Sequence, residues 1–223
     1  MIQNYNDFVK TLLDAGFSMG GGNAEGIYVI IPWGWNETPP YETPISWHTE
    51  DPETDPWEWR MRVLEERDDI AHGKLFFKKT GYITKEWYPY FLAVRREGMT
   101  FEEADARGLI SHFAKRIYDV VVAHGSLPVQ DIKSLGGFSR DDKAGFDRAL
   151  TELQMKMFLT MSGRQKIAAW PSTVFCTTEQ FWGQEVFDAA DKITKDNAYE
   201  KIKTQVLKLN PSAQEKQIKK FIF

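Results

Sequence analysis

The middle third of the chain alternates helical and strand patterns in an order that few folds use. From residue 110 to residue 175 the pattern is helix, short strand, helix, helix, strand, turn and strand, over 110–124, 126–128, 129–135, about 140–154, 155–161, 162–165 and 167–175. Gly125 and the pair Gly136-Gly137 separate the helical stretches, as glycines at helix ends do. This order predicts a winged helix, which is a helix-turn-helix followed by a β wing.

The remaining patterns favour an α+β fold that is mainly α, with an aromatic-rich N-terminal region. A first helix is predicted over 4–15 and a second from Asp55-Pro56 to about 68, where Asp55 can cap and Pro56 suits the first turn. Residues 26–32 read as a β-branched strand, and Thr80-Gly81 as a hairpin turn.

These elements suggest three parts of the chain. Residues 1–100 form the aromatic-rich α+β region, for which a degenerate winged helix is one interpretation. Residues 101–176 form the winged-helix domain. Residues 177–223 carry further helical patterns, and we expect these C-terminal helices to pack on the winged helix.

The predicted winged helix assigns roles to basic side chains. Its third helix enters the major groove in nucleic-acid complexes, and the outward residues of that helix are predicted to be Arg140, Lys143 and Arg148. The wing tip offers Arg164 and Lys166 to phosphates. Acids on the same helix, Asp141, Asp142 and Asp147, oppose this interpretation and keep a protein-contact role open.

Net charge is unevenly distributed along the chain. Residues 1–70 hold 4 Lys or Arg and 14 Asp or Glu, a balance of −10, whereas residues 71–223 hold 24 and 18, a balance of +6. An anionic partner such as double-stranded DNA is therefore compatible only with the C-terminal part of the chain.

Five of the eight tryptophans lie between residues 33 and 59, in a stretch where prolines prevent long regular structure. Together with His48 they could wall a pocket and stack on a flat base or another planar ligand; they are Trp33, Trp35, Trp47, Trp57 and Trp59. Cleavage of a glycosidic bond needs a group that orients or activates water. Glu50, Asp51 and Asp55 beside this cluster are candidates for it. The alternative is that the rings fill a small core and the acids are solvated.

Several classes of site and location are disfavoured. The single cysteine, Cys176, excludes an intrachain disulfide, and the four histidines show no metal-binding spacing, so we expect no metal and no cofactor. No apolar run approaches the roughly 20 residues that span a bilayer, and no secretory signal begins the sequence. A cytoplasmic protein without a membrane partner is expected, and the oligomeric state is not indicated.

Four blocks of sequence resemble bacterial proteins described as AlkZ-related, and the similarity extends from about residue 27 to 188. The blocks are SWHTEDPETDPWEWR at 46–60, IAHGKLFFKK at 70–79, EWYPYF at 86–91 and ALTELQ at 149–154. The resemblance implies winged-helix units and kinship with bacterial DNA glycosylases that remove bulky alkylated purines and unhook cross-links between strands.

The catalytic motif of that parent family is absent from its expected place. The motif is Gln-x-Gln or Gln-x-Asp after an early helix, whereas this chain reads Gly16-Phe17-Ser18-Met19-Gly20 there. The nearest match, Gln154-Met155-Lys156, lies much later and ends in lysine. Three interpretations stay open: a DNA-binding winged-helix protein of DNA repair, a non-catalytic module for protein contact or dimerisation, and an enzyme that binds a small planar ligand between tryptophans.

Overall fold

The computed structural model describes residues 1–22, 24–167 and 170–223, with the backbone alone for residues 166, 167 and 170. It is an α+β structure with more helix than strand, and none of the described helices is long and apolar enough to cross a membrane. The elements in chain order are α1 (Tyr5–Ala15), β1 (Phe17–Met19), α2 (Pro56–Glu66), β2 (Ile70–Phe76), β3 (Lys79–Thr84), α3 (Tyr88–Arg95), α4 (Phe101–Ala106), α5 (His112–His124), β4 (Leu127–Pro128), α6 (Val129–Leu135), α7 (Lys143–Met155), β5 (Leu159–Ile167), β6 (Trp170–Thr177), α8 (Thr178–Trp182), α9 (Gln184–Ala190), α10 (Lys195–Leu209) and α11 (Glu215–Ile222).

The N-terminal elements build an antiparallel sheet with the strand order β1-β3-β2, against which α1 and α2 pack. Asn4 caps α1 by accepting the Asp7 N–H, and Gly16 ends it with φ of +88°. A Cβ atom at Gly16 would clash with the ring of Trp87. Both the positive φ and this close approach therefore require glycine at the position. Because α1 ends at this single glycine, β1 begins at the next residue.

The turn between β2 and β3 lies at Phe77 and Lys78, so the predicted turn at Thr80-Gly81 is wrong. Both turn residues have positive φ, 49° and 62°, as a two-residue hairpin turn requires. Gly81 instead lies inside β3 opposite Gly73, where a Cβ would stand 2.5 Å from the Phe76 ring. The glycine at position 81 is therefore explained by close packing against Phe76 and not by a turn.

The strand predicted over 26–32 is also wrong, since this segment makes only an isolated bridge between Met19 and Val29. The Ser18 hydroxyl accepts the Ile30 N–H at 3.1 Å, and this side-chain contact takes the place of a backbone ladder bond. Ile27, Ile30 and Ile31 are nonetheless buried. The apolar pattern therefore predicted burial correctly but not a strand.

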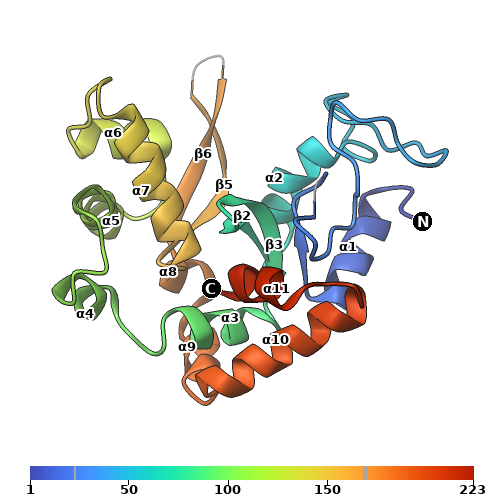
Figure 1. Ribbon diagram of the computed structural model, residues 1–223. Coiled ribbons are helices and arrows are strands. Elements are labelled where there is room, and N and C mark those ends of the chain that lie inside the picture. The colour runs from blue at the N-terminus through green and yellow to red at the C-terminus, as the bar shows by residue number, and fades with distance from the viewer. Residues whose placement is uncertain (23, 168–169) are drawn as a thin grey trace.

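A second sheet with the order β4-β6-β5 follows, again antiparallel. Along the chain, its strands alternate with helices in the order α5, β4, α6, α7, β5, β6 (Figure 1). The buried residues of its core all lie between residues 101 and 175. Phe101 stacks on Tyr118 with ring centroids 3.6 Å apart, and Phe146 and Leu153 of α7 are fully buried.

Two sequence predictions in this region need correction. Helix α7 begins at Lys143, so Arg140 lies in the loop before it. Strand β5 continues to Ile167, whereas 162–165 was predicted to be a turn. The pairing of β5 with β6 shifts register between Met161 and Gly163, and Gly163 has φ of +146°. Ser162-Gly163 therefore forms an irregularity of the bulge type inside a continuous strand.

Helices α9, α10 and α11 pack mainly on α3 of the N-terminal region, whereas we had expected the C-terminal helices to pack on the 101–176 segment (Figure 1). The reason is aromatic packing: Phe221 of α11 stacks on Phe76 at 4.1 Å and contacts Phe17 and Phe91. The short α8 contacts β5 and β6. The C-terminal helices thus complete the core of the N-terminal region.

Candidate functional site

Three predicted DNA-contacting residues lie exposed on α7 and in the loop before it. Arg140, Lys143 and Arg148 are all exposed, and none has an ion pair with another described residue. The buried face of α7 carries Phe146, Leu150 and Leu153 into the core. Arg148 lies on the side of α7 that faces away from this core.

The acids around this surface differ in availability. Asp142 accepts hydrogen bonds from the Ser139 N–H at 2.8 Å and the Ser139 hydroxyl at 2.9 Å, and these bonds lower the pKa of its carboxyl group. Asp141 and Asp147 remain exposed. The patch thus carries both signs of charge, with the cations in excess when Lys133 of α6 is included.

Lys133 is a basic residue that sequence reasoning missed. It lines a hollow of about 360 Å³ together with Arg140 and Lys143, and its Nζ lies 4.8 Å from the Phe146 ring centroid. The sequence signal was available, because residues 129–135 were correctly predicted as the helix preceding α7. In a helix-turn-helix the first of the two helices commonly touches the backbone of the nucleic acid.

The two residues predicted at a wing tip behave differently. Arg164 lies within β5, opposite Thr173, and is ion-paired with Glu58 at 2.9 Å and Glu65 at 2.8 Å, both on α2. These carboxylates raise its pKa and compensate its charge. The side chain of Lys166 lies outside the described residues. The two ion pairs of Arg164 therefore connect the β5–β6 hairpin to α2 of the N-terminal region.

A double-mutant cycle between Arg164→Ala and Glu58→Ala tests this assignment. Because both side chains are partly exposed, we expect a coupling of about 0.5–1 kcal/mol, measured by urea unfolding and decreasing with added salt. Arg148→Ala and Glu58→Ala should be additive. Equal couplings for the two pairs would contradict the contact between β5 and α2.

The five tryptophans of the N-terminal segment divide between core and surface. Trp33 and Trp59 are buried, and Trp59 stacks on Phe8 at 5.0 Å. Trp47 is partly buried and donates its indole N–H to the Trp33 carbonyl. Trp35 and Trp57 are 71% and 42% exposed. The core interpretation thus fits three of the rings, and two remain accessible.

The accessible rings flank His48. The His48 ring lies 4.6 Å from the Trp57 ring and 6.2 Å from the Trp35 ring, and the Arg60 guanidinium lies 3.3 Å from the Trp57 ring centroid. Such a row of aromatic and guanidinium groups can stack on a flat base or another planar ligand. Of the two tryptophans in this row, Trp35 exposes the larger fraction of its surface.

The three candidate carboxylates shape the loop before α2. Buried Asp55 accepts the N–H groups of His48, Thr49, Glu50 and Trp57 at 2.8–3.1 Å. Asp51 accepts from the Glu53 N–H and the Thr54 hydroxyl, which lower its pKa. Glu50 is exposed with φ of 62°. Both Asp55 oxygens are thus engaged in holding backbone.

The late Gln-Met-Lys sequence is likewise engaged in structure. Gln154 is buried, its Oε1 accepts the Lys74 N–H at 2.9 Å, and its Nε2 donates to the Leu150 carbonyl. These contacts join α7 to β2 of the N-terminal sheet. Gln154 is therefore held by protein groups at both of its polar atoms and is shielded from solvent.

His72 is a further buried group to which the sequence gave no role. Burial lowers its pKa to about 3, and Arg60 adds to this effect, so the ring is neutral. Its Nδ1 lies 3.1 Å from the Gly81 carbonyl and therefore carries the proton. Its Nε2 is then an acceptor, and it has no partner among the described residues.

The fold and this surface define an α+β protein with two small antiparallel sheets and an exposed set of cations on one helix. A family model described as AlkZ related matches residues 2–223, so the chain belongs to the AlkZ-related family. No curated protein and no solved structure matches the chain.

Proposed function

We propose that this chain is a DNA-binding winged-helix protein that acts in bacterial DNA repair. The observation that carries the proposal is the surface of α7, where Arg148 and Lys143 are exposed and have no acidic partner among the described residues. Exposed, unpaired cations on a helix provide the contacts that phosphates and base edges need.

The arrangement of residues 101–176 supports the winged-helix assignment. Helix α5, strand β4, helices α6 and α7 and the hairpin β5–β6 follow one another, and β6 pairs between β4 and β5. In such a unit the helix before the hairpin enters the major groove. We assign that position to α7 and the wing to β5–β6.

The N-terminal region repeats this order in reduced form. Helix α1, strand β1, helix α2 and the hairpin β2–β3 again give a sheet with its last strand in the middle. We therefore propose that residues 1–100 contain a degenerate winged helix, in which the tryptophan-bearing segment replaces the middle helix. Arg62 of α2 and, across the contact, Arg164 are already paired with Glu66, Glu58 and Glu65, so α7, whose cations have no such partners among the described residues, is assigned the DNA contact.

Family membership suggests a DNA glycosylase-like protein, but we assign no catalytic residue. The Gln-x-Gln or Gln-x-Asp motif is missing after α1, and Asp55 and Gln154 are engaged in backbone contacts. The proposed contribution of the N-terminal segment is stacking by Trp35 and Trp57 on an exposed base. The cytoplasm is the compartment that this function requires.

The proposal predicts a selective loss of affinity when the α7 cations are removed. Binding of a generic DNA duplex, measured by fluorescence anisotropy, should weaken about 10- to 100-fold in the variant Arg140→Ala, Lys143→Ala, Arg148→Ala. The control variant Lys192→Ala, Lys208→Ala, Lys216→Ala removes the same charge from exposed sites near the C-terminus. It should weaken binding several-fold less.

The outcomes separate the alternatives. Equal losses in both variants would contradict α7 as the contact surface and indicate a nonspecific charge effect. Absence of duplex binding at low salt would favour a module for protein contact. Release of alkylated purines by the wild-type chain would add a catalytic function to the binding that we propose.

A further inference from the structure

A hollow of about 550 Å³ lies at the C-terminal end of α7, between the β2–β3 turn and the end of α11. We call it the lysine-rimmed hollow, and its lining residues are Phe77, Lys78, Met155, Lys219, Lys220 and Phe223. Helix α7 has 13 residues, so about 20 Å of helix separates this hollow from the first turn of α7. It is therefore distinct from the cluster at Arg140 and Lys143.

Arg95 fixes the three walls of the lysine-rimmed hollow relative to one another. Its guanidinium donates to the carbonyls of Leu75 in β2, at 2.8 Å, and Met155 at the end of α7, at 3.3 Å. It also donates to the carbonyls of Phe221 and Ile222 in α11, at 2.9 and 2.8 Å. The lining residues belong to these three elements or directly follow them, so the shape of the hollow is set before a ligand binds.

Apolar side chains from all three walls enter the hollow. The ring of Phe77 lies 6.3 Å from the buried Phe221 ring, and Met155 is partly buried. Phe223 is 46% exposed and stacks on Tyr199 with ring centroids 6.0 Å apart. A hollow of this volume with an apolar lining admits an apolar side chain of a partner.

The three lysines of the hollow carry charge that the protein does not compensate. Lys78, Lys219 and Lys220 are exposed, and none of them forms an ion pair or a hydrogen bond with another described residue. Glu215, one turn before Lys219 on α11, binds Lys203 at 2.8 Å instead. The described lining contains no acid, so the hollow favours a negatively charged partner.

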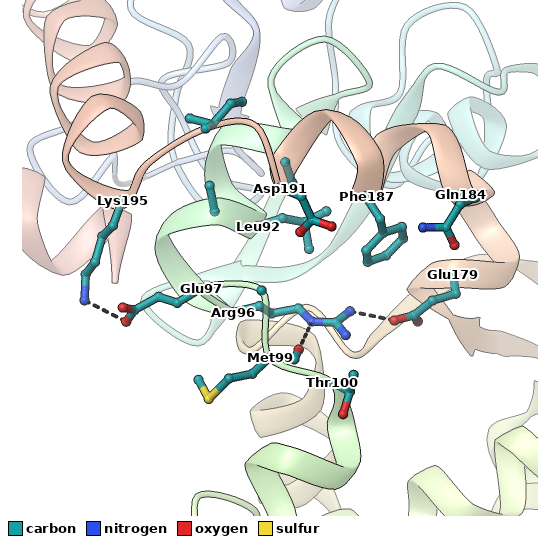
Figure 2. A pocket seen from close by; sticks show the side chains of 14 residues that line it. Leu92, Arg96, Glu97, Met99, Thr100, Glu179, Gln184, Phe187, Asp191 and Lys195 are labelled. Carbon is teal, nitrogen blue, oxygen red and sulfur yellow. Dashed lines mark hydrogen bonds and ion pairs between the residues drawn. The ribbon is translucent and has the colours of Figure 1, made fainter.

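The cavity beside α9 differs in this respect (Figure 2). Its cations are paired with acids of the same wall, Arg96 with Glu179 at 2.7 Å and Lys195 with Glu97 at 2.7 Å. Little charge is left there for a ligand, whereas the lysines of the hollow beside α7 have no such partners among the described residues.

We propose that the lysine-rimmed hollow docks an acidic peptide segment of a partner protein. One aromatic or aliphatic side chain of the segment packs against Phe77, Met155 and Phe223, and carboxylates on either side meet the lysines. The apolar contact supplies affinity, and the lysines select the charge of the partner. A phosphate backbone brings no side chain that fills the apolar part, so a peptide fits better than a duplex. This docking does not depend on DNA binding by α7.

Fluorescence anisotropy with three labelled peptides tests the proposal on the full chain. Asp-Glu-Phe-Asp-Glu carries both features, Asn-Gln-Phe-Asn-Gln lacks the charge and Asp-Glu-Ala-Asp-Glu lacks the ring. We expect the first peptide to bind with a Kd below about 1 mM, and at least about tenfold more tightly than either of the others. Its affinity should fall about five- to tenfold in the variant Lys219→Gln, Lys220→Gln.

The control variant Lys208→Gln, Lys216→Gln removes the same charge from exposed sites outside the hollow and should bind the acidic peptide as the wild type does. Both variants change exposed side chains, so their melting temperatures should stay within about 2 °C of the wild type. Equal binding of the three peptides, no binding of the acidic peptide at millimolar concentration, or equal losses in the two variants would overturn the proposal. Displacement of the peptide by duplex DNA, with an equal loss of duplex affinity in Lys219→Gln, Lys220→Gln, would also overturn it and assign the hollow to the phosphate backbone.

Discussion

Replacing Asp55 by alanine is expected to lower the free energy of unfolding by about 4 kcal/mol, the largest effect we predict for one side chain. The buried carboxylate accepts four backbone N–H groups, from His48, Thr49, Glu50 and Trp57. One of these bonds caps α2, and the other three hold the loop that carries His48. Without Asp55 these donors lose their acceptor in a place that water reaches poorly.

For a chain of this length the loss corresponds to a fall in melting temperature of about 8–16 °C, measured by calorimetry or circular dichroism. Glu42→Ala is the matched control, because Glu42 is an exposed acid of the same segment without a hydrogen bond or ion pair to another described residue. It should change stability by less than about 0.5 kcal/mol. Similar shifts in the two variants would show that Asp55 does not organise the loop.

Arg95→Met is expected to destabilise the chain by about 3 kcal/mol and to release the C-terminus. The Arg95 guanidinium donates to the carbonyls of Leu75, Met155, Phe221 and Ile222, so one side chain connects β2, the end of α7 and α11. Burial lowers the pKa of Arg95 to about 10, and the group stays charged at neutral pH. Methionine keeps much of the stem but leaves four carbonyls without this donor.

Hydrogen exchange provides a readout specific to this role. Amides of α11 should lose protection in Arg95→Met, while amides of α5 and of the first turns of α7 keep theirs. Arg107→Ala removes an exposed arginine and serves as control. Uniform loss of protection over the whole chain would mean that Arg95 does not act locally on α11.

Local signals explain which elements could be predicted from the sequence. Residues 129–135 form α6 as predicted, the Asp55-Pro56 pair opens α2, and Gly16 ends α1. In each case the side chains that decide the structure lie within a few residues of it, as caps and helix stops do. The exposure of Arg148 also follows from such a local pattern, whereas Trp59, which we had placed among the rings of a pocket, is buried.

The remaining features depend on contacts between distant parts of the chain. Arg164 was predicted at a wing tip, but its partners Glu58 and Glu65 are about a hundred residues away in sequence. Phe221 packs on Phe76, which brings the C-terminal helices to the N-terminal region. Gly81 and Gly163 looked like turns because a sequence does not reveal whether a glycine serves a turn, a close approach or a bulge.

The salt dependence of duplex binding tests the central claim, that the α7 cations meet a phosphate backbone. Affinity is measured by anisotropy between about 50 and 200 mM KCl for the wild type and for Arg140→Ala, Lys143→Ala, Arg148→Ala. Each lost phosphate contact lowers the slope of log affinity against log salt by about one, so we predict a slope smaller by about two to three. Parallel lines for the two proteins, or a wild type that binds no duplex at the lowest salt, would contradict the account.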